Sequence, residues 1–174
     1  MYACTSKEEQ YKKTVKSYYD AYYQKRDINA VKALFSEKGI QYNDDNYKMS
    51  PDTFTLIFDF DKKIQTKAYI VDIKVNKDTV IVLEKLADQL DALLKRPSPQ
   101  YRKRFIFKEG KIYEIISKVE NEKEWTDKYL QATQNFLLWV FKKHPTEYQK
   151  ISLEPYNHAE LLLTNAKEYA KELK

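Results

Sequence analysis

The sequence predicts an α+β fold, because helical patterns occupy both ends of the chain and strand patterns occupy the middle. A length of 174 residues, 43% of them apolar, is typical of one soluble globular domain. We therefore expect a flexible N-terminus over residues 1–6 and a single domain over residues 7–174. Its core is expected to end near residue 120, and residues 121–174 are expected to form a helical extension.

The first helix is expected over residues 7–25, where one apolar stripe recurs at helical spacing: Tyr11, Val15, Tyr18 and Tyr22. This helix contains KSYYDAYYQK (residues 16–25), with four tyrosines in six residues. Tyr19 and Tyr23 lie about 100° round the helix from the stripe. We expect these two to pack under a neighbour or meet solvent.

Two more helices are expected in the first third of the chain. Asp27 can cap the second helix, and Gly39 follows it where a left-handed residue is favoured. A short strand follows over residues 40–42. Ser50 and Pro51 are a typical helix start, with a capping side chain and a proline at the first helical position.

The middle of the chain predicts four longer strands, over residues 68–75, 79–83, 101–107 and 111–119. A short helix is expected over residues 84–95, ended by Pro97 and Pro99. The tail then returns to a helical period with a stripe from Trp125 to Val140, ended by Pro145. Asn157 and Glu160 resemble a capping box for a last helix. The extension is therefore predicted to be a helical pair.

Three stretches in this order carry a family resemblance: Asp27–Phe35 before a strand and an acidic turn, the interrupted segment Glu84–Pro99, and Arg104–Ile112 around a glycine turn. They resemble the nuclear-transport-factor-2-like superfamily, which includes the SnoaL-like polyketide cyclases and the ketosteroid isomerases. The resemblance covers about residues 7–120. It implies a strongly curved, mostly antiparallel sheet that forms a cone around the N-terminal helices and leaves a conical cavity.

The resemblance also suggests which residues face the cavity. The predicted ligand-binding residues are Tyr18, Tyr22, Tyr42, Asn43, Tyr101, Lys103 and Phe105. If Tyr101 and Phe105 face the cavity, strand alternation places Lys103 on the same face. Such a lysine requires an anionic or hydroxylated ligand or an internal acid; the alternative is an edge position where its stem reaches solvent.

The isomerases of this superfamily use a carboxylate base, a tyrosine and a neutral carboxylic acid. Matching this chain places Asn43, which cannot accept a proton, at the base position, and Lys103 near the acid position. The tyrosine matches Tyr18 or Tyr19. A complete set is therefore missing, and no catalytic residue is assigned; if the protein is an enzyme, the candidates are Lys103, Tyr18 and Asp44.

Cys4 is the single cysteine, so no intrachain disulfide can form. Its setting, Ala3-Cys4-Thr5-Ser6, resembles the end of a bacterial lipoprotein signal, where the cysteine becomes lipidated. This predicts a bacterial cell-envelope protein held at the membrane only through a lipid anchor. The alternatives are a free cysteine in a frayed N-terminus and a cytoplasmic location.

Composition argues against several other classes of function. The net charge of +5 is spread along the chain, which does not predict nucleic-acid binding. Two glycines cannot build a glycine-rich phosphate loop, and two histidines make a poor metal site. Aspartates 44, 45, 59 and 61 could gather around a cation, but Asp59 and Asp61 follow a helix and are expected in solvent. We expect no metal and no cofactor.

These observations favour a non-catalytic protein of the cell envelope that binds a small hydrophobic or aromatic molecule. One alternative is a SnoaL-like enzyme of cyclase, isomerase or dehydratase type, acting on a polar aromatic or polyketide-like substrate. Another is a homodimeric interaction module with a filled cone. An open cavity would separate the first two hypotheses from the third.

Overall fold

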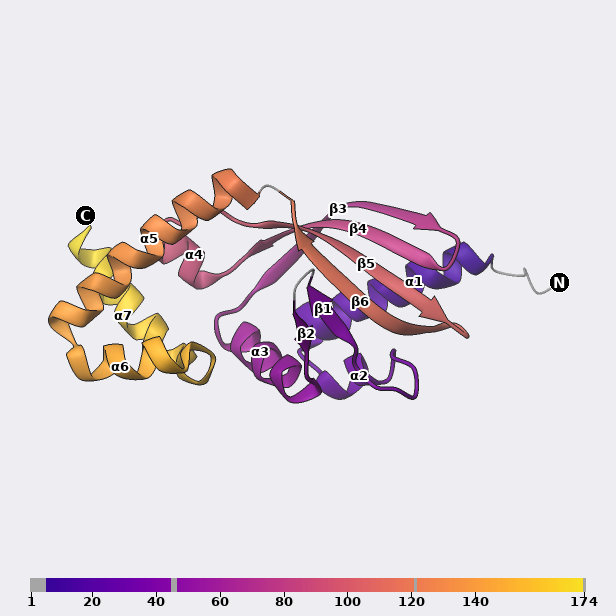
Figure 1. The fold of residues 1–174 in the computed structure, drawn as a ribbon, viewed down its shortest axis with the longest axis horizontal. Helices are drawn as coiled ribbons and strands as arrows, with labels where there is room; N and C mark the ends of the chain where they lie inside the picture. Colours follow the sequence, from indigo (N-terminus) through magenta and orange to yellow (C-terminus); the bar gives the residue numbers. More distant parts are fainter. Residues whose placement is uncertain (1–5, 45–46, 121, 174) are drawn as a thin grey trace.

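The computed structural model describes residues 6–44, 47–120 and 122–173, and its fold is α+β (Figure 1). The described residues form one sheet with the strand order β2-β1-β6-β5-β4-β3. Only β1 and β6 pair in parallel, which confirms a mostly antiparallel sheet. The strands are β1 (Tyr42–Asp44), β2 (Lys48–Met49), β3 (Lys67–Asn76), β4 (Thr79–Ala87), β5 (Gln100–Lys108) and β6 (Lys111–Val119).

The N-terminal helices pack against one face of this sheet. They are α1 (Lys7–Tyr19), a π-helical segment (Asp20–Lys25), α2 (Ile28–Lys32) and α3 (Pro51–Lys63). Ser6 and Glu9 form a capping box at the start of α1, and Ser50 caps α3. Bulges in β3 and between β5 and β6 bend the strands, so that the sheet curves around α1 (Figure 1). The predicted cone fold is confirmed.

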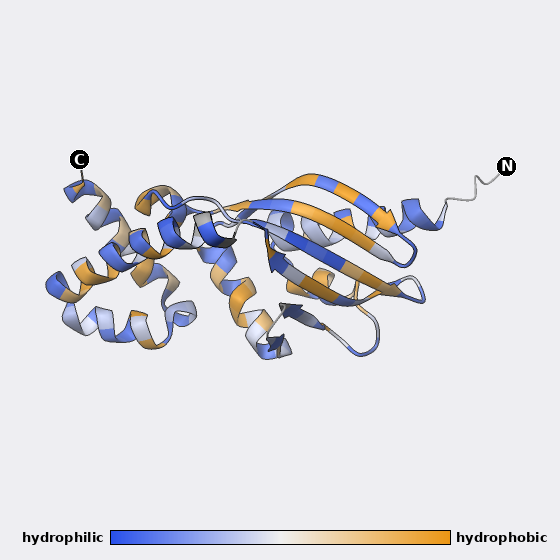
Figure 2. Cartoon of the chain, turned by 45° about the horizontal axis from the view of Figure 1, so that its top comes forward, coloured by the Kyte–Doolittle hydropathy of each residue, from blue (hydrophilic) through white to orange (hydrophobic). Residues whose placement is uncertain are grey.

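One end of the cone is closed by apolar side chains. Phe105 and Phe107 alternate inward from β5. Ile112 and Ile115 point inward from β6 on either side of a bulge, and all four are buried. Tyr11 of α1 stacks on Phe107, with 4.0 Å between ring centroids. Figure 2 shows the corresponding hydrophobic stretches along the strands, whereas the exposed start of α1 is hydrophilic.

The predicted helix over residues 84–95 is wrong in its first part. Strand β4 continues to Ala87, and only α4 (Gln89–Leu94) is helical, capped by Asp88. The inward alternation of Val80 and Val82 continues through Glu84, which is fully buried in the strand. The strand continues because Glu84 has a charged partner inside the cone.

The C-terminal extension contains three α-helices rather than the predicted pair: α5 (Glu122–Lys143), α6 (Pro145–Leu153) and α7 (Ala159–Glu172). Pro145 occupies the first turn of α6, where a missing N–H costs nothing, so it starts a helix as well as ending one. A short 3₁₀ segment (Pro155–His158) joins α6 to α7. The predicted capping box is wrong, because Asn157 donates its hydrogen bond to Glu154.

The extension has a hydrophobic cluster of its own. Phe136, Val140, Leu162 and Ala166 pack with Ile64 at the end of α3 and with Leu90 and Leu94 of α4. In Figure 1 the C-terminal helices α5, α6 and α7 lie at the opposite end of the molecule from the start of α1. No helix in the described ranges is long and apolar enough to cross a membrane.

Candidate functional site

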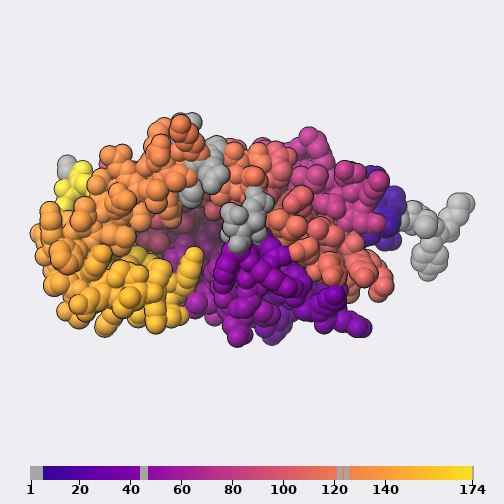
Figure 3. Space-filling model, in the orientation of Figure 1, coloured from indigo at the N-terminus to yellow at the C-terminus, as the bar shows by residue number. Residues whose placement is uncertain are grey.

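A cavity of about 510 Å³ lies where the cone meets the C-terminal helices. Its walls come from the π-helical segment, α3 and strands β4 to β6. Its roof is formed by α4 with its flanking residues Asp88 and Arg96 and by residues of the extension, including Tyr129 and Tyr156. Figure 3 shows the corresponding hollow between the orange and yellow C-terminal helices and the purple N-terminal segments. The cone is therefore not completely filled by side chains.

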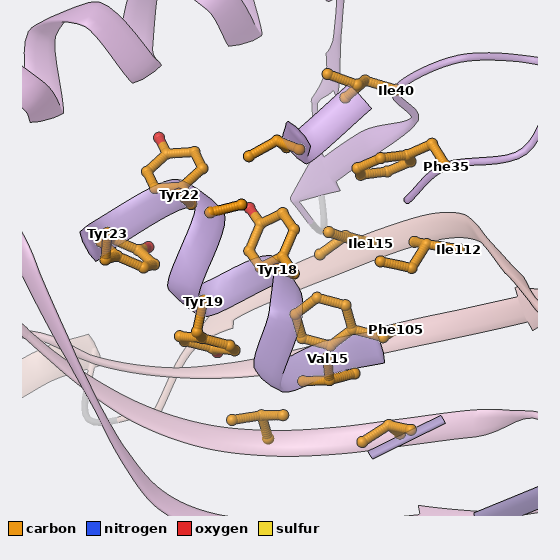
Figure 4. Close-up of a cluster of buried hydrophobic side chains, with 14 of the residues drawn as sticks. Val15, Tyr18, Tyr19, Tyr22, Tyr23, Phe35, Ile40, Phe105, Ile112 and Ile115 are labelled. Carbon is orange, nitrogen blue, oxygen red and sulfur yellow. The ribbon is translucent and has the colours of Figure 1, made fainter. Parts of the chain in front are cut away.

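The four tyrosines of KSYYDAYYQK are all buried (Figure 4). Of the two alternatives expected for Tyr19 and Tyr23, packing under a neighbour is confirmed and exposure to solvent is wrong. The curved sheet and α3 contact two neighbouring stripes of the helix, so Tyr19 reaches Glu84 while Tyr22 packs on Phe58 of α3. Three of the four, Tyr18, Tyr22 and Tyr23, line the cavity.

Lys103 lies at the inner end of the cavity and is buried there with a charged partner. Its Nζ is 2.7 Å from Oε1 of Glu84 and donates to the Tyr23 hydroxyl at 3.2 Å. The Tyr19 hydroxyl donates to the other oxygen of Glu84 at 2.5 Å. The alternative in which Lys103 reaches solvent is therefore wrong, and the internal acid that such a lysine requires is Glu84.

The electrostatic surroundings keep Lys103 charged and the neighbouring tyrosine hydroxyls neutral. Burial alone lowers the pKa of Lys103, but Glu84 and then Tyr23 outweigh burial and hold that pKa well above its usual value. Burial raises the pKa of Tyr18, Tyr19 and Tyr23 far above the usual value for tyrosine. Lys103 is therefore a cation and these hydroxyls keep their protons at neutral pH.

Asp61 faces the cavity from the end of α3, which corrects the expectation that it lies in solvent. Its Oδ2 accepts from the Tyr22 hydroxyl at 2.7 Å, and its Oδ1 accepts from the Thr66 hydroxyl at 2.9 Å. Burial raises the pKa of Asp61, against the lowering effect of these two hydrogen bonds. Asp59, by contrast, is exposed as expected.

A second charged group lies at the roof of the cavity. The Arg96 guanidinium is 2.9 Å from Oδ1 of Asp91 and 3.8 Å from Oδ1 of Asp88, and it lies 4.4 Å from the ring centroid of Tyr129. Burial, helped by Asp88, raises the pKa of Asp91 to about 6 although Arg96 opposes this. These contacts join α4 and its following loop to α5.

The structure brings together most of the predicted ligand-binding residues. Five of them line the cavity: Tyr18, Tyr22, Tyr42, Tyr101 and Lys103. Phe105 lies instead in the closed core beside Tyr18, and the Asn43 amide donates to Glu114. Asp44 ends β1, but its side chain lies outside the described part of the chain, as does Cys4.

Sequence reasoning missed five residues of this site: Tyr23, Glu84, Asp88, Asp91 and Arg96. Glu84 had a usable signal, since a carboxylate at an inward position of a β-branched strand is buried only with a partner. The sequence holds no comparable signal for Asp91 and Arg96, because charged residues at a helix end before two prolines are normally solvated. Among the described residues, no three His, Cys, Asp or Glu side chains lie close enough together to bind a metal ion.

No protein-family model matches this chain, and no curated protein matches its sequence. Similar solved structures exist. Bal32a from a soil-derived mobile gene cassette superimposes with a TM-score of 0.56 at 18% identity, over 70% of this chain and 97% of that one. AclR, a candidate hydroxylase from Streptomyces galilaeus, gives 0.55 at 14% identity, over 70% of this chain and 85% of that one.

A candidate SnoaL-like polyketide cyclase from Jannaschia sp. CCS1 gives a TM-score of 0.53 at 14% identity, over 69% of this chain and 92% of that one. Each neighbour is thus covered almost completely, while a large part of this chain has no counterpart in it. At these identities the likeness establishes the fold and leaves the activity open. The chain has the cone fold of the nuclear-transport-factor-2-like and SnoaL-like superfamily, extended at its C-terminus.

Proposed function

We propose that this protein binds a small, largely apolar molecule in the cavity between the cone and the C-terminal helices. One observation carries the proposal. Tyr18 is only 1% exposed and lines the cavity, yet no described residue forms a hydrogen bond with its hydroxyl. A hydroxyl that opens to a cavity without a protein partner is available to a ligand oxygen, and one such hydrogen bond contributes about 1 kcal/mol.

The walls support a ligand of mixed character. Apolar side chains such as Phe54, Ile57 and Leu86 line the middle of the cavity. Hydrogen-bond donors gather at the inner end, where the Lys103 ammonium and the Tyr18 hydroxyl share the wall. A mostly apolar pocket with a few converging polar groups is typical of small-molecule sites. A flat molecule that carries a carbonyl or hydroxyl oxygen fits this arrangement.

An enzyme is the second candidate, because a proton acceptor faces the same cavity as these donors. Lys103 and Tyr18 could stabilise negative charge on a substrate oxygen, and Asp61, with its raised pKa, could transfer a proton. Among the structural neighbours is a candidate polyketide cyclase. A cyclase-, isomerase- or dehydratase-type reaction on a polar aromatic or polyketide-like substrate would use these groups, with Asp61 in place of the Asp44 that the sequence suggested.

A cell-envelope location is a further part of the proposal and rests only on the residues around Cys4. It predicts that a bacterial host labels the full-length gene product with radioactive palmitate. Cys4→Ser should abolish that label. A product that carries no label with Cys4 intact favours the cytoplasmic alternative.

A homodimer through the sheet is equally a proposal, to be checked by analytical ultracentrifugation.

Calorimetric titration with 2-naphthalenemethanol tests the binding proposal, because this probe combines a flat apolar ring system with one hydroxyl. We expect saturable binding with a stoichiometry of one, and an affinity about tenfold weaker in Tyr18→Phe, which loses one hydrogen bond. Tyr113→Phe is the matched control, since Tyr113 lies outside the cavity and its hydroxyl contacts Lys38. Equal affinities in wild type and Tyr18→Phe would contradict the proposed site.

A further inference from the structure

The charged side chains around the cavity do not balance. Among the described residues that line it, three are acidic and two are basic: Asp61, Asp88 and Asp91 against Lys103 and Arg96. Glu84, directly behind Lys103, adds a further carboxylate. Both cations are therefore already paired, Lys103 with Glu84 at 2.7 Å and Arg96 with Asp91 at 2.9 Å.

Two carboxylates are left without a full cationic partner. Asp61 accepts hydrogen bonds from the neutral hydroxyls of Tyr22 and Thr66, and Lys103 lowers its pKa without an ion pair between the two in the described part of the chain. Asp88 accepts the backbone N–H of Asp91 through Oδ1 at 2.7 Å, and Arg96 lies 3.8 Å from that same oxygen. No described residue forms a hydrogen bond with Oδ2 of Asp88, whereas the Asp91 carboxylate accepts from Arg96 and from the backbone N–H of Asp88. Free acceptors therefore lie at the roof, whereas free donors lie at the inner end.

This distribution decides which charge a bound molecule can carry. A carboxylate or phosphate would add a negative charge beside an already negative wall, and it could recruit no unpaired cation there. An ammonium group at the roof would meet the free oxygen of Asp88 beside the Asp91 carboxylate, in a setting where charges interact more strongly than in water. The Tyr18 hydroxyl lines the same cavity without a described hydrogen-bond partner, so it offers a polar contact to the other end of a bound molecule.

We propose that the ligand is an aromatic or alicyclic amine, with its ammonium group at the Asp88–Asp91 roof and an oxygen or ring edge at Tyr18. This inference rests on the proposed binding function and narrows it to one ligand class. The sequence left open whether Lys103 meets an anionic or hydroxylated ligand or an internal acid; because Glu84 is that acid, Lys103 does not require an anionic ligand. The roof carboxylates are held by the start of α4, and Arg96, which pairs with Asp91, lies against Tyr129 of α5.

Three probes with one ring system test the charge preference: 2-naphthalenemethylamine, 2-naphthalenemethanol and 2-naphthoic acid, titrated calorimetrically at pH 7.5. We expect the amine to bind at least about tenfold more tightly than the acid, with the alcohol between them. Binding by none of the three would contradict the proposed function itself. Binding of the acid as tightly as the amine, with the alcohol also bound, would overturn only the amine proposal.

Asp88→Asn locates the preference at the roof. Asparagine caps a helix about as well as aspartate, so α4 should keep its start. We expect the ratio of amine to acid affinity to fall about threefold to tenfold in this variant, with alcohol binding unchanged. Asp59→Asn, on the exposed side of α3, is the charge-matched control and should leave the ratio as it is in the wild type. An unchanged ratio in Asp88→Asn would place the selecting charge elsewhere and overturn the proposal.

Discussion

The two halves of strand β5 face the inside of the same cone but meet different surroundings. Phe105 and Phe107, in the second half, lie in a closed apolar core with Tyr11 and Ile112. Tyr101 and Lys103, in the first half, line a cavity that the C-terminal helices cover. Strand β4 repeats the change, with Val80 and Val82 in the core and Glu84 beside Lys103.

The change from core to cavity coincides with a single ion pair. On one side of the pair, inward residues such as Val82 and Phe105 pack in the core. On the other side, Leu86 and Tyr101 line the cavity. A buried pair of this kind adds little net stability compared with apolar residues of similar size, because removing two charges from water offsets their attraction. The pair therefore makes more sense as a fixed polar end of a binding site than as a support for the fold.

The largest change in the free energy of unfolding is expected from removing one member of the Lys103–Glu84 pair. Glu84→Leu leaves the Lys103 ammonium buried without its carboxylate and should lower the free energy of unfolding by about 3–5 kcal/mol. Glu84→Leu combined with Lys103→Met should recover most of this loss, because no uncompensated charge is left. Urea unfolding of the single and double variants measures both values.

A matched surface pair provides the control for this measurement. Lys74 and Asp72 lie 2.8 Å apart but are exposed, so Asp72→Asn should leave the free energy of unfolding nearly unchanged. If the double variant at positions 84 and 103 stays as unstable as the single one, the pair supports the fold after all. Its interpretation as the end of a binding site would then need revision.

A slightly smaller loss of stability, confined to the C-terminal helices, is expected from a substitution in the core of the extension. Phe136 is 1% exposed in the cluster of the C-terminal helices, and Phe136→Ala should cost about 3 kcal/mol. Because the cone has a separate cluster, hydrogen exchange should speed up about a hundredfold in α5 and α7 while β4 and β5 keep their protection. Phe105→Ala, in the cone, should speed exchange throughout the chain. Equal acceleration of both regions in Phe136→Ala would mean that cone and extension unfold as one unit.

Much of the fold could be predicted because its signals are local. Alternation identified β5 and β6, a capping serine with a proline identified α3, and the order of elements indicated the cone. The prediction failed where the environment overrode the local pattern. Glu84 was assigned to the helix predicted over residues 84–95, and its partner Lys103 on the neighbouring strand explains why β4 continues through it.

The site could be predicted only in part. Helical and strand periodicity placed Tyr18, Tyr22 and Lys103 on inward faces. Periodicity cannot show how far the sheet curves, and this curvature is what buries Tyr19 and Tyr23 as well. It also cannot show that the C-terminal helices cover the cavity, since Arg96 and Tyr129 meet only in the folded chain.

The smallest expected effect is the pH dependence that Asp91 gives to the free energy of unfolding. Its sign shows whether burial or Arg96 dominates at the roof of the cavity. Asp91 holds its proton more tightly when folded, since burial raises its pKa to about 6, whereas an unfolded aspartate titrates near 4. A raised pKa in the folded state gives stability that is present below about pH 4 and is lost as the pH rises through about 6. Relative to Asp91→Asn, the wild type should therefore lose up to about 2 kcal/mol between pH 4 and pH 7.

Urea unfolding of wild type and Asp91→Asn at intervals of one pH unit measures this difference directly, because contributions from all other groups cancel between the two proteins. The groups that face Asp91 are Asp88, Arg96 and Tyr129. If the wild type instead gains stability over this range, Arg96 outweighs burial and Asp88. The roof would then be a closed ion pair, and Asp91 would have no free charge to offer to an amine.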